Sequence, residues 1–353
     1  MRLDPIPVMQ PKLPPLEHVS NYLEKMYSNG IYSNHGPLVK MLEKRYADYF
    51  NVDADLVVLS SSATQALEGA VKLSPAETFY VPAFTFPAPA LSVINSGKET
   101  SFLDVDALNW HLDLEPIGST KDQGIMYVLP FGSSYIDPKV YQFENVIIDA
   151  AASIGNIDLV LSDLPKSWVV VFSLHVTKVL GVGEGGISIF GNSAAANQFR
   201  AWINFGFSGN RNSNSNGTNA KMSEITASFG LSALDLAEEE FEEWKASRKL
   251  VNKIEDATGL KSFSRDLGGH NPYWIVDFES ADRKIEAVRK LSDAQIESRD
   301  WWSSGAKAMT IFNEFTRDRT FPNTESITGR TLGLPFFRGL TSKQCDAIFN
   351  CLN

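Results

Sequence analysis

The sequence predicts an α/β fold, in which a large domain with a mostly parallel sheet sandwiched by helices precedes a smaller α+β domain. Short, uniformly apolar runs recur through the first 190 residues, and such runs are typical of strands buried on both faces of a sheet. Helical segments alternate with these runs, which favours parallel strands. After residue 220 the alternation gives way to a long helical stretch and then a smaller α+β pattern, and we place the boundary within that helix, between domains at 1–240 and 241–353.

The elements follow in order along the chain. Helices are expected over 16–26 and, after the Gly36-Pro37 breaker, over 38–49. Apolar runs then predict strands, and the segments between several of them predict helices. The expected strands are 56–59, 78–81, 101–104, 125–129, 146–149, 169–172 and 187–190, with helices over 63–73 and after Pro87. Beyond them lie a long helical stretch over 222–250, a strand over 273–278, and helices over 283–291 and 342–352.

Composition and charge exclude several classes of protein. The chain has 353 residues, 43% of them hydrophobic, and a net charge of −10, which argues against a general nucleic-acid binder. No apolar stretch approaches the roughly 20 residues of a membrane span, and the first residues do not resemble a signal peptide. Cys345 and Cys351 are too few for a disulfide framework or a zinc site. We therefore expect a soluble, cytoplasmic protein without a bound metal.

Lys178 is the first candidate for chemistry. It follows the apolar run 169–172 and precedes a glycine-rich segment, 181–186. A lysine at the end of a strand, among apolar residues and glycines, is partly desolvated, which makes its neutral amine a nucleophile toward an aldehyde. The plainer interpretation of a single such lysine is an exposed loop residue. The glycine segment has the spacing of a dinucleotide motif, but a strand follows it instead of a helix, so we predict a tight turn.

Asp149 is the second candidate, because it ends the buried run 146–149. A carboxylate at the carboxyl edge of a parallel strand lies where α/β proteins bind ligands, and it could hold a proton on a pyridine nitrogen. The alternative is that Asp149 merely caps a following helix.

Two further segments could contact a planar, phosphorylated ligand. Residues 60–64, with Ala63 and Thr64, follow a strand and open a helix, where free backbone N–H groups and the helix dipole favour a phosphate. Phe86 follows another strand and could stack on a planar ring. The alternatives are an ordinary helix cap at the first segment and a core aromatic at Phe86.

Taken in order, these motifs resemble the DegT/StrS family of sugar aminotransferases, within the aspartate aminotransferase fold and its seven-stranded sheet. The resemblance covers nearly the whole chain, from Gly30-Ile31-Tyr32-Ser33 to Leu334-Pro335-Phe336-Phe337. Between these ends it runs through the Ser-rich turn, Pro82-Ala83-Phe84-Thr85-Phe86, Val146-Ile147-Ile148-Asp149-Ala150-Ala151, Phe172-Ser173-Leu174-His175-Val176-Thr177-Lys178 and Gly217-Thr218-Asn219-Ala220-Lys221.

The resemblance implies a role for each matched residue. Lys178 would carry pyridoxal 5′-phosphate as a Schiff base and shuttle protons. Asp149 would pair with the pyridine nitrogen, and Phe86 would cover one face of the ring. Ala63, Thr64 and Ser173 would contact the phosphate. Asn219 would reach the phosphate bound by the other subunit of a homodimer, so that each active site is shared.

The resemblance also implies a reaction, with alternatives. Glutamate would donate its amino group to the cofactor, which would pass it to a ketosugar linked to a nucleotide. A sugar dehydratase and a non-catalytic regulator on the same fold are the alternatives. Lys178 argues against the first, since family dehydratases have histidine there, and the three retained site residues argue against the second.

The sequence departs from the family in two regions near the predicted site. Ala152 stands where the family usually has a polar residue beside the cofactor ring, which leaves the substrate open. The segment 297–302 also differs from the family pattern. Trp301 or Trp302 could stack on a sugar or base, although a buried or interfacial tryptophan is the more frequent case.

Overall fold

The computed structural model describes residues 4–265, 267, 270–302 and 305–353. Its centre is a seven-stranded sheet in the order β1-β7-β6-β5-β4-β2-β3. The strands are β1 (Val57–Ser60), β2 (Thr78–Pro82), β3 (Glu99–Leu103), β4 (Gln123–Val128), β5 (Asn145–Asp149), β6 (Val169–Ser173) and β7 (Gly186–Phe190). All neighbouring pairs from β3 to β6 are parallel, whereas β7 is antiparallel to both β6 and β1. The predicted α/β class is confirmed.

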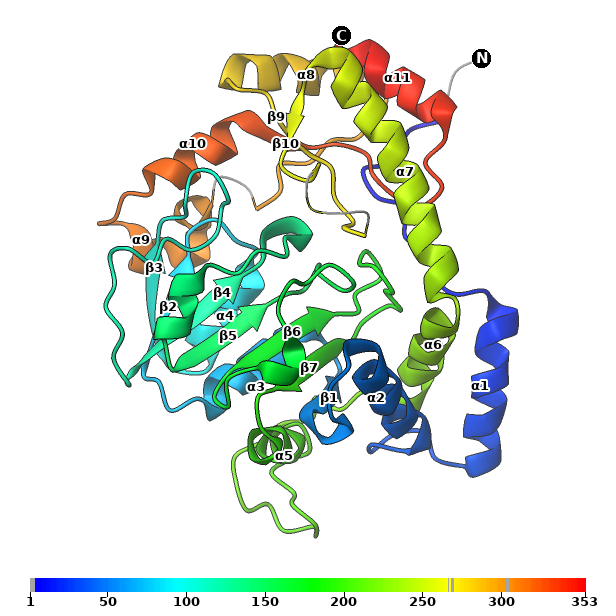
Figure 1. The fold of residues 1–353 in the computed structure, drawn as a ribbon, viewed down its shortest axis with the longest axis vertical. Helices are drawn as coiled ribbons and strands as arrows, with labels where there is room; N and C mark the ends of the chain where they lie inside the picture. The colour runs from blue at the N-terminus through cyan, green and yellow to red at the C-terminus, as the bar shows by residue number, and fades with distance from the viewer. Residues whose placement is uncertain (1–3, 266, 268–269, 303–304) are drawn as a thin grey trace.

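Helices cover both faces of this sheet, as Figure 1 shows. On one face lie α3 (Ala63–Leu73), α4 (Pro87–Asn95) and α5 (Ser193–Trp202), and on the other α2 (Pro37–Phe50) and α6 (Glu224–Asp235). Within β5, Ile147 faces the first layer while Val146 and Ile148 face the second. Every position of the strand is therefore buried, which explains why the run is uniformly apolar.

Helix α7 (Ala237–Thr258) leads from this layered part to a three-stranded antiparallel sheet, β10-β9-β8. The strands are β8 (Lys261–Ser262), β9 (Ile275–Asp277) and β10 (Thr331–Gly333), and the helices around them are α8 (Ala281–Asp293), α9 (Asn313–Thr316), α10 (Pro322–Arg330) and α11 (Ser342–Leu352). Near the start of the chain, Ile6 forms a bridge with Ile296, and α1 (Leu16–Asn29) packs beside α6. The division at residue 240 stays a prediction.

The prediction of one continuous helix over 222–250 is wrong in one respect. The chain forms two helices, α6 and α7, because Leu236 leaves helical geometry with φ −104° and ψ 13°. Helix α5, α10 and strand β10 were not expected from the pattern. Among the described residues, no helix combines the length and the apolar character that a membrane span requires.

Candidate active site

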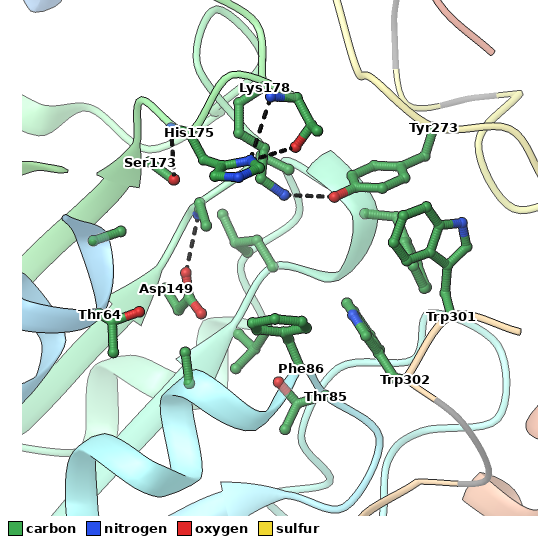
Figure 2. A pocket seen from close by; sticks show the side chains of 18 of the residues that line it. Thr64, Thr85, Phe86, Asp149, Ser173, His175, Lys178, Tyr273, Trp301 and Trp302 are labelled. Atoms are coloured by element: carbon green, nitrogen blue, oxygen red, sulfur yellow. Dashed lines mark hydrogen bonds between the residues drawn. The ribbon is translucent and has the colours of Figure 1, made fainter. Parts of the chain in front are cut away.

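Six of the seven predicted site residues line one cavity of about 410 Å³. They are Ala63, Thr64, Phe86, Asp149, Ser173 and Lys178. The cavity lies where β4, β5 and β6 end and where α3 and α4 begin, and segments near β9 and β10 close it from the other side (Figure 2). Parallel strands present their carboxyl ends at one edge of a sheet, which is why residues far apart in the sequence meet here.

Lys178 lies in a tight turn rather than at the end of a strand. Strand β6 ends at Ser173, but its pairing continues through bonds from Leu174 N to Gly185 O (2.9 Å) and from Val176 N to Gly183 O (2.8 Å). Gly183 has φ +122°, which side chains rarely allow. The predicted turn between two strands is confirmed, and the turn holds Lys178 at the cavity, half-buried.

Asp149 is the last residue of β5 and only 6% exposed. One carboxylate oxygen accepts the Ala151 N–H at 3.0 Å. Burial raises the pKa of Asp149 to about 6, and the Ala151 hydrogen bond and the Lys178 charge oppose that rise. Residues 150–153 form a turn and not a helix, so the alternative role as a helix cap has no helix to cap. A buried carboxylate in this state favours a cationic partner.

The first turn of α3 is open to the cavity. Ser62 is its N-cap, and the Ser62 side chain accepts the Gln65 N–H at 3.2 Å. Ala63 and Thr64 are the first two helical residues, whose N–H groups have no partner within a helix. Ser173 lies at the same end of the cavity wall, and its hydroxyl accepts the His175 N–H at 3.1 Å. These groups can hold an anion such as a phosphate.

Phe86 is 56% exposed, so the alternative of a core aromatic is wrong. It caps the N-terminus of α4, and Pro87 follows as the first helical residue. Figure 2 shows its ring projecting into the cavity near Thr85. An exposed ring on a cavity wall is a surface on which a planar ligand can stack.

The opposite wall was largely missed by the sequence reasoning, because it comes from distant segments. The Lys178 amine donates a hydrogen bond to the Tyr273 hydroxyl at 2.5 Å, and Trp302 stacks on Phe131 with centroids 4.0 Å apart. Trp301 and Trp302 are half-buried and line the cavity. No sequence spacing connects Tyr273 with Lys178. His175, which also lines the cavity, lies in the segment from Phe172 to Lys178 that carries the family resemblance.

Two predicted features bear on the site in a different way. Ala152 lines the cavity with a buried methyl group, so the polar residue common in the family has no equivalent at this position. Asn219 is exposed and does not line the cavity of its own chain. Its side-chain oxygen accepts a hydrogen bond from Lys221 at 2.7 Å.

The residues present fit pyridoxal 5′-phosphate. Asp149 is a buried carboxylate with a raised pKa, which suits a protonated ring nitrogen. The open N-terminus of α3 suits the phosphate, Phe86 offers an exposed ring, and Lys178 supplies an amine on the same cavity.

The chain is similar to known aminotransferases. The model of the DegT/DnrJ/EryC1/StrS aminotransferase family matches residues 16–353. The dTDP-4-amino-4,6-dideoxy-D-glucose transaminase of Shigella dysenteriae is 32% identical over 241 residues, which are 65% of each chain. The GDP-perosamine synthase of Caulobacter vibrioides is 27% identical over 343 residues, or 91% of each chain.

Solved structures share the fold. DesI, solved in the presence of its TDP-sugar product, aligns with a TM-score of 0.86 and 23% identity over 99% of this chain and 93% of its own. NtdA from Bacillus subtilis, solved with bound cofactor PMP, aligns with a TM-score of 0.80 and 19% identity over 96% of this chain and 81% of its own.

Fold and cavity together define a pyridoxal-phosphate-dependent transferase of the type I fold. The chain belongs to the DegT/DnrJ/EryC1/StrS aminotransferase family, and its activity is that of a pyridoxal-phosphate-dependent aminotransferase. This assignment sets aside the alternative of a non-catalytic regulator.

Proposed function

We propose that this enzyme moves an amino group from glutamate to a ketosugar linked to a nucleotide. The observation that carries the proposal is the placement of Lys178, Asp149 and the N-terminus of α3 around one cavity. The acceptor class is supported by relatives whose names specify dTDP- and GDP-linked sugars. The choice of glutamate as the amino donor rests on the family resemblance. The retained Lys178 again speaks against the dehydratase alternative.

The residues of the cavity have distinct tasks in the proposed reaction. When bound, pyridoxal phosphate supplies an electron sink for bonds at the carbon that carries the amino group. Lys178 holds the cofactor and moves the proton at that carbon, from its half-buried position beside the cavity. Asp149 keeps the ring nitrogen protonated, because its buried carboxylate gains from a cation.

The remaining residues bind and orient. The N–H groups of Ala63 and Thr64 and the hydroxyl of Ser173 would hold the phosphate at the positive end of α3. Phe86 would cover one face of the ring, since its own ring is exposed to the cavity. The cavity is also lined by aromatic side chains, among them Tyr273, Trp301 and Trp302, and by polar ones such as Glu184 and Arg299, which would contact the substrate.

We also propose a homodimer in which Asn219 completes the phosphate site of the partner subunit. Exposed apolar side chains lie on segments that contact the segment containing Asn219. Lys221 lies 4.5 Å from the ring of Phe205, and the carbonyl of Tyr32 accepts the Glu224 N–H at 3.1 Å. Phe205, Tyr32 and Ile225 are each 45–50% exposed. An apolar patch of this kind favours burial against a second copy of the chain.

Two further features of the protein are proposals. A cytoplasmic location is supported by the free state of Cys345 and Cys351, the only cysteines in the chain. A division into two domains near residue 240 is supported by the two separate sheets, which α7 connects.

The proposed function is tested by a screen of keto-sugar nucleotides. Each acceptor is incubated with the enzyme and glutamate, and mass spectrometry detects the aminated sugar and 2-oxoglutarate. We expect both products in equal amounts with one acceptor class, and neither product with Lys178→Ala. If amino sugars form from another amino donor but not from glutamate, the donor assignment is wrong. If no nucleotide-linked acceptor reacts while free ketosugars do, the acceptor assignment is wrong.

A further inference from the structure

The hydroxyl of Tyr273 lies against the amine of Lys178, although 95 residues separate the two along the chain. The Nζ–Oη distance is 2.5 Å, and Nζ is 4.9 Å from the centroid of the tyrosine ring. Tyr273 lies just before β9, beside the smaller sheet, whereas Lys178 lies in the turn between β6 and β7. The contact, drawn in Figure 2, therefore joins a segment beside the smaller sheet to a turn of the larger one at the cavity.

Buried contacts hold Tyr273 in this position. Its N–H donates to the side chain of Asn271 at 3.1 Å, and its carbonyl accepts from the buried guanidinium of Arg248. The tyrosine ring meets Phe131 and Trp301 edge-on, with centroids 5.4 and 5.3 Å away. Only 8% of Tyr273 is exposed. Its hydroxyl is thus fixed before any ligand binds, as effective positioning groups are.

Within the described part of the chain, one hydrogen bond with a side chain involves the Lys178 amine, although other polar residues, such as Asp149 and Glu184, also line the cavity. Among the residues that the structure describes, the hydroxyl of Tyr273 is the only side-chain group hydrogen-bonded to the Lys178 amine. Ala152 on the same wall contributes a methyl group, and Trp302 and Phe131 contribute stacked rings. An amine on a four-carbon chain in such a cavity has many rotamers available unless one hydrogen bond selects among them.

We propose that Tyr273 is a positioning residue for Lys178. Its hydroxyl holds the amine at the cavity whenever that amine is not bonded to the cofactor. This positioning raises the rate at which the amine reacts with the aldehyde carbon of the cofactor. The inference rests on the proposed role of Lys178. Tyr273→Phe is the direct test, because it keeps the ring and its contacts with Phe131 and Trp301 but removes the hydroxyl.

The experiment compares two forms of the cofactor with cofactor-free protein. Pyridoxal phosphate reacts with the lysine: the neutral amine forms a C=N bond to the aldehyde carbon, and its two hydrogens leave with the aldehyde oxygen as water. Pyridoxamine phosphate has no aldehyde, so its affinity measures the non-covalent site alone. Stopped-flow absorbance gives the capture rate of the first form, and equilibrium dialysis gives the dissociation constant of the second.

We expect Tyr273→Phe to slow capture about tenfold, as follows from the loss of one hydrogen bond of about 1.4 kcal/mol. The dissociation constant of pyridoxamine phosphate should stay within twofold of the wild-type value. Tyr80→Phe is the matched control, because it removes a hydroxyl bonded to Gln123 at 2.8 Å away from the cavity. That variant should change neither quantity.

Two results would overturn the positioning role. One is a capture rate in Tyr273→Phe within twofold of wild type. The other is an equal loss in both measurements, which would indicate general damage to the site. A peptide map after borohydride reduction separates failure of this inference from failure of the proposed function. If the label is on Lys178 in both proteins, only the inference is in question, whereas a label elsewhere would contradict the role of Lys178 itself.

Discussion

Replacing Asp149 with asparagine should stabilise the cofactor-free protein while impairing the enzyme. The carboxyl group is buried at the end of β5, and this burial raises its pKa from 3.8 to about 6. Because the folded state binds the proton more tightly than the unfolded chain does, the stabilising contribution is full below pH 3.8. It is lost as the pH rises through about 6. At pH 8 the charged carboxylate therefore costs about 3 kcal/mol, at 1.36 kcal/mol per pKa unit.

Asparagine removes the cost of burying a charged carboxylate and keeps the shape of the side chain. Its amide oxygen can still accept the Ala151 N–H, which Asp149 accepts at 3.0 Å. We expect cofactor-free Asp149→Asn to exceed wild type in free energy of unfolding by up to about 3 kcal/mol at pH 8. The difference should shrink by about 1.4 kcal/mol at pH 5, where wild-type Asp149 takes up its proton.

Urea unfolding of both cofactor-free proteins between about pH 8 and pH 5 measures this difference. Asp137→Asn is the matched control, since Asp137 also accepts the N–H two residues ahead, from Lys139 at 2.9 Å, but is only half-buried. With cofactor and substrates present, Asp149→Asn should lose about one to two decades in rate, because a neutral amide stabilises a pyridinium poorly. A pH-independent stability difference, or wild-type turnover in the variant, would refute the reasoning.

Other substitutions probe the remaining walls of the site and its assembly. Phe86→Ala should raise the dissociation constant of pyridoxamine phosphate about tenfold in equilibrium dialysis, since ring stacking contributes roughly 0.5–1.5 kcal/mol; an unchanged constant would mean that the ring does not cover the cofactor. Co-expressed Lys178→Ala and Asn219→Ala subunits should form a heterodimer more active than either mutant homodimer, because one of its two sites holds both intact residues. A heterodimer no more active than the homodimers would exclude the shared site, provided that Asn219→Ala alone is impaired.

The sequence could predict the strands and most of the site for one physical reason. Strands buried on both faces must be apolar throughout, as Ile147 and Ile148 illustrate by facing opposite helix layers. Residues that follow such strands then meet at the shared edge of the sheet. The family resemblance, and not strand position alone, then assigned Asp149 and Lys178 to one site.

Features that depend on tertiary packing could not be predicted in this way. No glycine or proline marks the break at Leu236, which occurs where α6 ends its contact with α1 and α2 and α7 begins to lead toward α11 and the smaller sheet. Helix α5 begins at an asparagine cap, Asn192, and buries only Ala196, Phe199 and Trp202. Strand β10 has only three residues, too few for a periodic pattern.

The wall opposite Asp149 was missed for a related reason. Tyr273 looked like the first residue of a strand, and only the folded chain brings its hydroxyl to Lys178. Trp301 and Trp302 gave no periodic pattern either, and their contacts with Tyr273 and Phe131 connect segments far apart in sequence. A role for Asn219 depends on a second subunit, which no pattern within one chain can position.

The central claim is that Lys178 binds the cofactor, and one measurement tests it most directly. The enzyme purified with pyridoxal phosphate is reduced with borohydride, digested and mapped by mass spectrometry. The account predicts a single pyridoxyl-labelled peptide that contains Lys178, in the cavity shared with Asp149 and Phe86. A label on any other lysine, or a protein that turns over substrate without acquiring a label, would contradict it.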